Sequence, residues 1–338
     1  MSDKGLELVC PAGGLPALRT AVDHGADAVY LSLRGEVNAR NFPGLNFDRK
    51  TLVKGIQYAH SHGARVYMAL NTYPQPDLFD QATAAIDVAA AEGIDAVILA
   101  DMGVMRYAAQ THPELKLHLS VQGSATTADA LNFYHERFGV RRAVLPRVLS
   151  LAQVEQVIKR SKIDIEVFGF GSLCVMVEGR CMLSSYATGD APNTHGACSP
   201  AHAVRWIETD KGREARLNGV LIDTFKPGES AGYPVICKGR YQVGDAPEHF
   251  YAIEEPTSLS TLDILPDLYR IGVRAIKLEG RQRSPAYVAE ATRVMRAAID
   301  ACHENPEGFR VKPDWAQALA GMSEGRTQTL GALHRAWQ

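Results

Sequence analysis

The sequence predicts an α/β fold, a TIM-type (β/α)8 barrel with a large cysteine-bearing insertion between the seventh and eighth strands. The first observation is a weak internal repeat, in which a helical pattern ends at a glycine and a short run of Val, Ile and Leu follows. Copies of the repeat begin at His24, Glu92, Phe138 and Ile271. Glycine commonly ends a helix, and a short β-branched run between turns is typical of a buried parallel strand. The repeat therefore indicates successive βα units.

The second observation is the number of candidate strands. Eight apolar runs fit, at Leu6–Val9, Ala28–Ser32, Arg65–Leu70, Ala96–Ala100, Leu117–Val121, Ala143–Pro146, Asp164–Phe168 and Arg274–Leu278. Amphipathic helical patterns lie between them, for example at Pro16–His24, Lys50–His62, Gln81–Glu92 and Leu151–Arg160. Asn46 or Asp48 is a candidate cap of the second helix, and Ser284-Pro285 suits the start of the helix Ala286–His303. At 338 residues, we expect a single (β/α)8-like domain over residues 1–338.

The third observation is the long interval between the last two strands. Residues 174–255 form the predicted insertion, and two stretches in it resemble hairpins. One turns at Asp210-Lys211-Gly212 and the other near Gly244-Asp245. An insertion of this size with strands of its own predicts a functional subdomain rather than a passive loop.

Four of the six cysteines lie in this region: Cys174, Cys181, Cys198 and Cys237. The N-terminus lacks the basic-then-apolar pattern of a secretion signal, so we expect a cytoplasmic protein with reduced thiols. The intervals of 6, 16 and 38 residues do not match the close pairs of structural zinc sites. An iron–sulfur cluster fits better, although zinc and plain burial stay open, and His195 is a less favoured fourth ligand. Cys10 and Cys302 are predicted to be buried structural residues.

Polar side chains follow the predicted strands at their carboxyl ends, where TIM barrels place their active sites. The candidate ligand-binding residues are Asn38, Arg40, Asn71, Gln122, Arg147, Glu279 and Arg281. Arginines at this mouth suit a ligand with a carboxylate or phosphate. The alternative is ordinary ion pairing, for instance of Arg281 with Glu279 or Glu255. No residue stands out as the acid or base, so the catalytic residues are not assigned.

Composition and missing motifs exclude several classes. The formal charge of −2 and pI near 6.6 give no electrostatic footprint for nucleic acid. No apolar run is long enough for a transmembrane segment. The G-x-S-x-G elbow, the H-E-x-x-H zinc motif and the Walker loop are all missing.

Three blocks of sequence resemble a known family. The pattern ExFxxGSLCxxxxGRCxxS from Glu166 to Ser184, KLEGRQRSPAYV from Lys277 and CPAG from Cys10 are similar to the collagenase-like U-32 peptidases. Further blocks, among them NARNFPGLNF, SVQGSAT and GACSPA, resemble the branch that acts in anaerobic ubiquinone biosynthesis. The resemblance extends over essentially the whole chain.

The resemblance implies a 4Fe-4S cluster on Cys174, Cys181, Cys198 and Cys237 rather than proteolysis. It further implies oxygen-independent hydroxylation of the aromatic ring of a ubiquinone precursor, as a heterodimer with a UbiV-like family member. Prephenate, the oxygen source of related members, is a possible donor. The alternatives are an RNA-base hydroxylating enzyme of the same family, a peptidase, and a scaffold whose cluster only stabilises the fold. The chain stops about sixty residues after the KLEGR block, unlike the longer members that act on RNA, so we expect no nucleic-acid partner.

Overall fold

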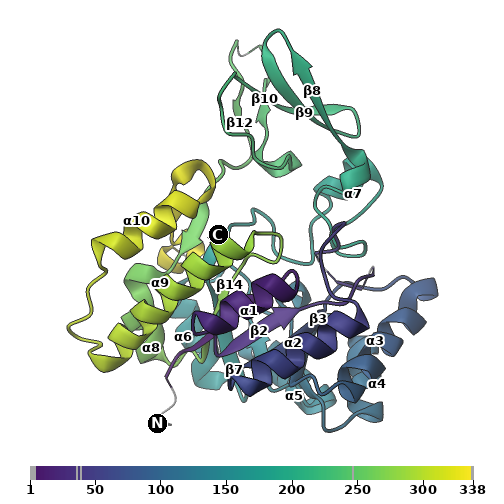
Figure 1. Ribbon diagram of the computed structural model, residues 1–338, viewed down its shortest axis with the longest axis vertical. Coiled ribbons are helices and arrows are strands. Elements are labelled where there is room, and N and C mark those ends of the chain that lie inside the picture. The colour runs from purple at the N-terminus through teal and green to yellow at the C-terminus, as the bar shows by residue number, and fades with distance from the viewer. Residues whose placement is uncertain (1–4, 36, 39, 246, 336–338) are drawn as a thin grey trace.

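The computed structural model describes residues 5–35, 37–38, 40–245 and 247–335, and eight parallel strands close into a barrel within them (Figure 1). Each strand pairs with the next along the chain, and the last pairs with both the seventh and the first. The strands are β1 (Glu7–Pro11), β2 (Ala28–Leu31), β3 (Arg65–Leu70), β4 (Ala96–Leu99), β5 (Lys116–Leu119), β6 (Arg142–Val144), β7 (Asp164–Ser172) and β14 (Ala275–Leu278). The predicted TIM-type fold is confirmed.

Helices follow the strands and cover the outside of the barrel (Figure 1). They are α1 (Leu15–Asp23), α2 (Arg49–Ser61), α3 (Phe79–Ala91), α4 (Met102–Thr111), α5 (Ala128–Phe138), α6 (Leu151–Arg160), α8 (Leu265–Ile271) and α9 (Pro285–Glu304). Of the two candidate caps of α2, Asp48 is the one used, since its carboxylate accepts from the Thr51 amide. Ser284 caps α9, and Pro285 is its first residue. A further helix, α10 (Pro313–Met322), packs on α9.

The seventh strand is longer than the predicted Asp164–Phe168. It continues to Ser172 because β13 (Ser258–Ser260) pairs antiparallel with its last residues, and β15 (Gln328–Thr329) extends that sheet. Gly171 permits this path, with φ of +136°. A Cβ there would lie 2.5 Å from the Cβ of Glu279, so only glycine lets β7 pass so close to the end of β14.

The interval between β7 and β13 leaves the barrel and forms a separate lobe (Figure 1). It begins with the cysteine loop and α7 (Leu183–Thr188). A three-stranded antiparallel sheet follows, built from β8 (Val204–Thr209), β9 (Gly212–Leu217) and β10 (Val220–Phe225). The short pair β11 (Arg240–Tyr241) and β12 (Phe250–Tyr251) completes it. The first predicted hairpin thus gains a third strand through a second turn, at Asn218-Gly219.

The inside of the barrel is unusually rich in paired charges. Lys277 Nζ lies 2.8 Å from Glu166 Oε1, and Arg142 lies 2.8 Å from Glu7 and 3.4 Å from Glu166. Arg65 and Arg274 bind Glu7 from the amino-terminal end, at 3.0 and 2.8 Å. Each of these four cations therefore has a carboxylate partner. In the described part of the chain, no helix is both long and apolar enough to cross a membrane.

Candidate active site at the barrel mouth

Two of the mouth arginines are held in one network around Glu279, which follows β14. Arg40 Nη2 donates to Glu279 Oε1 at 2.8 Å, and Arg147 Nη1 lies 3.3 Å from Glu279 Oε2. Arg147 Nε also donates to Glu178 Oε1 at 2.6 Å. Burial opposes ionisation of Glu279, but the two guanidiniums overcome it and lower its pKa to about 2. These arginines carry charge that carboxylates of the chain already balance.

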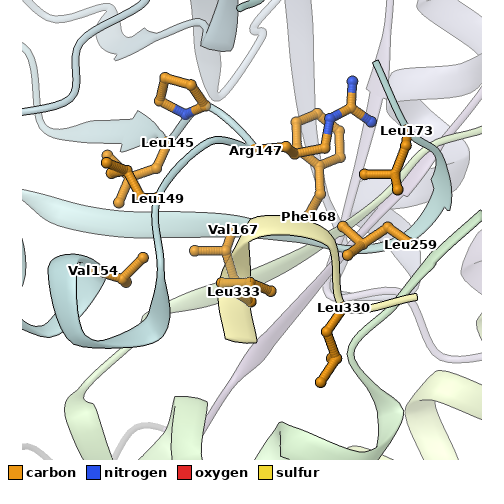
Figure 2. A pocket seen from close by; sticks show the side chains of 11 residues that line it. Leu145, Arg147, Leu149, Val154, Val167, Phe168, Leu173, Leu259, Leu330 and Leu333 are labelled. Carbon is orange, nitrogen blue, oxygen red and sulfur yellow. The ribbon is translucent and has the colours of Figure 1, made fainter. Parts of the chain in front are cut away.

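Arg147 sits between this network and an apolar pocket (Figure 2). Its guanidinium lies 4.4 Å from the centre of the Phe168 ring and donates to the Ser172 carbonyl. The pocket has room for about 20 Å³, which is about one water molecule. Its wall combines residues near β6 and β7 with the C-terminal segment: Leu145, Pro146, Leu149, Val154, Val167, Phe168, Leu173, Leu259, Leu330 and Leu333. Sequence reasoning missed this pocket, because Leu330 and Leu333 come from the far end of the chain.

Arg281 occupies a different environment from Arg40 and Arg147. Its Nη1 donates to Ser32 Oγ and lies 3.4 Å from Asn38 Oδ1. The guanidinium stands 5.6 Å from the centre of the Tyr30 ring. The sequence offered Glu279 or Glu255 as partners of Arg281. The structure instead gives Glu279 to Arg40 and Arg147.

Asn71 and Gln122, which follow β3 and β5, form a second group. Asn71 Nδ2 donates to Ser120 Oγ at 3.1 Å, and the Gln122 backbone carbonyl accepts from Tyr73 at 2.6 Å. The cysteine loop packs directly on this group, since a Cβ at Gly179 would lie 2.0 Å from the Gln122 carbonyl oxygen. The Gln122 Oε1 atom is buried and lacks a hydrogen-bond partner among the described residues.

The four clustered cysteines share one electrostatic environment. Burial and the nearby Cys174 thiol raise the pKa of Cys237 to about 12, and Cys198 adds to this. Burial raises the pKa of Cys174 to about 11, against the pull of Arg147. Cys198 feels both Arg40 and Cys181. The thiols thus face one another and the mouth arginines, although they come from distant points of the loop.

Hydrogen bonds hold the cysteine backbone and leave the thiols unpaired. Asn193 donates to the Cys181 carbonyl at 3.0 Å, Ser184 donates to the Cys198 carbonyl, and the Glu254 amide donates to the Cys237 carbonyl at 3.1 Å. All six cysteines are free of disulfides, and Cys10 and Cys302 are buried as predicted.

The arrangement can be tested for a metal. Among the described residues, no three His, Cys, Asp or Glu side chains are close enough to hold one metal ion. A single zinc with Zn–S bonds of about 2.3 Å would draw its thiolates within about 4 Å of one another. An iron–sulfur cluster places a separate iron at each cysteine, so it accepts a wider ring of thiolates. The four thiols therefore fit a cluster better than a single ion. His195 is tied to Thr194 at 2.9 Å within its own loop.

Residues that the sequence did not single out complete the mouth. Glu324, near the C-terminus, accepts from Lys238 at 2.5 Å, from Arg283 at 2.9 Å and from Ser172. Glu178 balances Arg147. Glu178 lies within the matched cysteine block, so its position was a usable signal, whereas nothing local marks Glu324.

Comparisons with known proteins agree on a family. A family model described as peptidase family U32 matches residues 13–335. An uncharacterized protease of Methanocaldococcus jannaschii is 34% identical over 87% of this chain and 65% of its own length. The tRNA hydroxylation protein P of Escherichia coli is 30% identical over 97% of this chain and 74% of its own length. The 23S rRNA 5-hydroxycytidine C2501 synthase of Escherichia coli is 29% identical, covering 96% of this chain but 43% of its own length. The chain therefore spans less than two thirds of the first and third of these relatives.

Proposed function

Because the chain belongs to peptidase family U32, we propose that it is an iron–sulfur subunit of an oxygen-independent hydroxylase that modifies an aromatic ring. The observation that carries the proposal is the convergence of four thiols on the Arg40–Glu279–Arg147 network at the mouth of a TIM barrel. The names of two relatives, a tRNA hydroxylation protein and an rRNA hydroxycytidine synthase, support the reaction class. A peptidase is disfavoured because neither a nucleophile–base motif nor a zinc motif is present in the sequence.

In this proposal Cys174, Cys181, Cys198 and Cys237 hold a 4Fe-4S cluster. When bound, the cluster supplies electron transfer or activates the oxygen donor. The chain's own contribution is electrostatic. Arg40 and Arg147 face the thiols and favour their thiolate forms, because a nearby positive charge stabilises an anion. Glu279 holds both arginines in place.

For the substrate, the sequence blocks favour a UbiU-like role. The chain would act in the cytoplasm on the ring of a ubiquinone precursor, as a heterodimer with a UbiV-like partner and with prephenate as a possible oxygen donor. The net charge of −2 supports a small-molecule ring, because RNA-binding proteins usually carry a basic surface that neutralises phosphates.

The second candidate is hydroxylation of an RNA base, and the comparisons favour it over the ubiquinone role. The named relatives act on tRNA and 23S rRNA, and none of the three is named for a quinone pathway. The substrate class is the point on which sequence blocks and relatives disagree.

One experiment separates the two candidates. Cells lacking this chain are grown without oxygen, and ubiquinone and hydroxylated nucleosides are both measured by mass spectrometry. Loss of ubiquinone alone, restored by the wild-type chain and not by Cys237→Ala, supports the UbiU-like role. Loss of a hydroxylated nucleoside alone supports the RNA alternative. If both products persist without the chain, the hydroxylase proposal is wrong.

A further inference from the structure

Arg281 is a buried cation without a carboxylate partner among the described residues. Its side chain belongs to a residue that is only 5% exposed. Within the described structure only Nη1 makes hydrogen bonds, to Ser32 Oγ and to Asn38 Oδ1 at 3.4 Å. Both partners are neutral. The Nε and Nη2 groups, three of the five N–H donors of the guanidinium, have no protein acceptor there.

The charged groups nearest to Arg281 do not neutralise it. Glu279 is the carboxylate in reach, but its two oxygens face Arg40 at 2.8 Å and Arg147 at 3.3 Å. The Tyr30 hydroxyl donates to the Leu278 carbonyl at 2.8 Å, and burial raises the Tyr30 pKa, so the phenol stays neutral. Counting Glu178 with Glu279, three mouth arginines face two carboxylates, which leaves one positive charge.

An unbalanced buried charge is costly, and proteins keep one where a ligand supplies the opposite charge. Burial lowers the pKa of Arg281 to about 10, with Arg40 adding repulsion. The pKa values of Arg40 and Arg147 are raised, because carboxylates outweigh the same burial. Arg281 thus differs from the other two arginines in the one property that an anion would correct.

The groups that hold Arg281 are themselves fixed. Ser32 Oγ donates to the Ala69 carbonyl at 2.8 Å, so its lone pairs face Arg281. The Asn38 amide donates to the Leu33 and Gly35 carbonyls at 3.2 and 3.3 Å, which turns its Oδ1 toward Arg281. A guanidinium held through one nitrogen, with its remaining donors unused, is organised in advance for a planar anion.

We infer that Arg281 is the receptor for one carboxylate group of a small organic acid bound at the barrel mouth. The single unbalanced charge matches a carboxylate, whereas a phosphate dianion would leave a net negative charge. This inference deepens the proposed function, and it rests on that function only for the role of the acid as a co-substrate. Binding of the anion does not depend on it.

The test is calorimetric titration of the anaerobically purified protein with four probes: prephenate, benzoate, uncharged benzamide and inorganic phosphate. We expect saturable binding of at least one carboxylate, no binding of benzamide, and at least tenfold weaker carboxylate binding in Arg281→Met. The variant should have an equal or higher melting temperature, because Met removes an unpaired charge at similar volume. Ser32 and Asn38 keep their other hydrogen bonds.

Arg40→Met is the matched control, since it removes a mouth arginine whose charge is balanced. It should lower the melting temperature by leaving Glu279 short of a partner. The inference is overturned if neither carboxylate binds, if phosphate alone binds, or if Arg281→Met lowers the melting temperature and leaves carboxylate binding unchanged. Because the readout is binding, it stands apart from any failure to find hydroxylation or a cluster.

Discussion

The inside of the barrel and its mouth treat buried charge in opposite ways. Inside, Arg142 and Lys277 each lie within 3.4 Å of a carboxylate, and Glu166 serves both. At the mouth, Arg40 and Arg147 are balanced but Arg281 is held by neutral groups. The difference teaches that charge alone does not mark a functional site. A buried charge that the chain itself balances holds the fold, and one that it leaves unbalanced points to a ligand.

The comparison extends to the cysteines, where the largest effect is expected. Cys237→Ala should remove most of the iron and acid-labile sulfide from the anaerobically purified chain, because one of four cluster ligands is lost. Cys302→Ala is the control, since Cys302 is equally free of a disulfide but buried under α9. It should keep its iron. Equal iron in both variants, or one zinc and no sulfide in the wild type, would contradict the cluster.

Glu166→Gln breaks the balance inside the barrel. It leaves Lys277 and Arg142 with one carboxylate fewer in a buried site, so we expect the free energy of unfolding to fall by about 3–5 kcal/mol. Urea denaturation measures it. Glu136→Gln is the control, because it breaks only the exposed pair with Lys162 and should cost less than about 1 kcal/mol. Similar small losses in both variants would mean that the interior pairs are not structural.

Glu279→Gln sharpens the comparison through its pH dependence. Since the folded pKa of Glu279 is about 2 and its ordinary value is 4.5, the carboxylate contributes stability that is complete above about pH 4.5. That contribution is lost as the pH falls toward 2, and it amounts to about 3 kcal/mol at most. The variant lacks it, so the stability difference between wild type and Glu279→Gln should shrink between pH 5.5 and pH 3.5. Urea unfolding across that range measures the difference. A constant difference would mean that Glu279 does not titrate with the predicted shift.

The barrel could be predicted because its information is local. Each βα unit carries its own helix end, glycine and apolar run, and the Glu92–Asp101 copy shows all three within ten residues. The extension of β7 to Ser172 could not be predicted, because it depends on β13, whose residues follow the whole insertion. Local patterns predict elements, whereas strand pairing across long intervals depends on the fold as a whole.

The candidate site divides in the same way. The order of strands was sufficient to bring Asn38, Arg40, Arg147, Glu279 and Arg281 to one mouth, since parallel strands end at the same rim. Their pairing was not accessible, because ion pairs form between side chains far apart in the chain. Glu279 is separated from Arg40 by 239 positions and from Arg147 by 132.

The sequence by itself determined the barrel, the place of the insertion and the family, because repeated local patterns and long matching blocks are properties of the chain's order. Only the tertiary structure decided which arginine lacks a carboxylate partner. Arg40 and Arg281 are alike in sequence, as cations that follow a predicted strand. Which of them is balanced depends on distances of a few ångströms between separate loops, and those distances exist only once the barrel has closed.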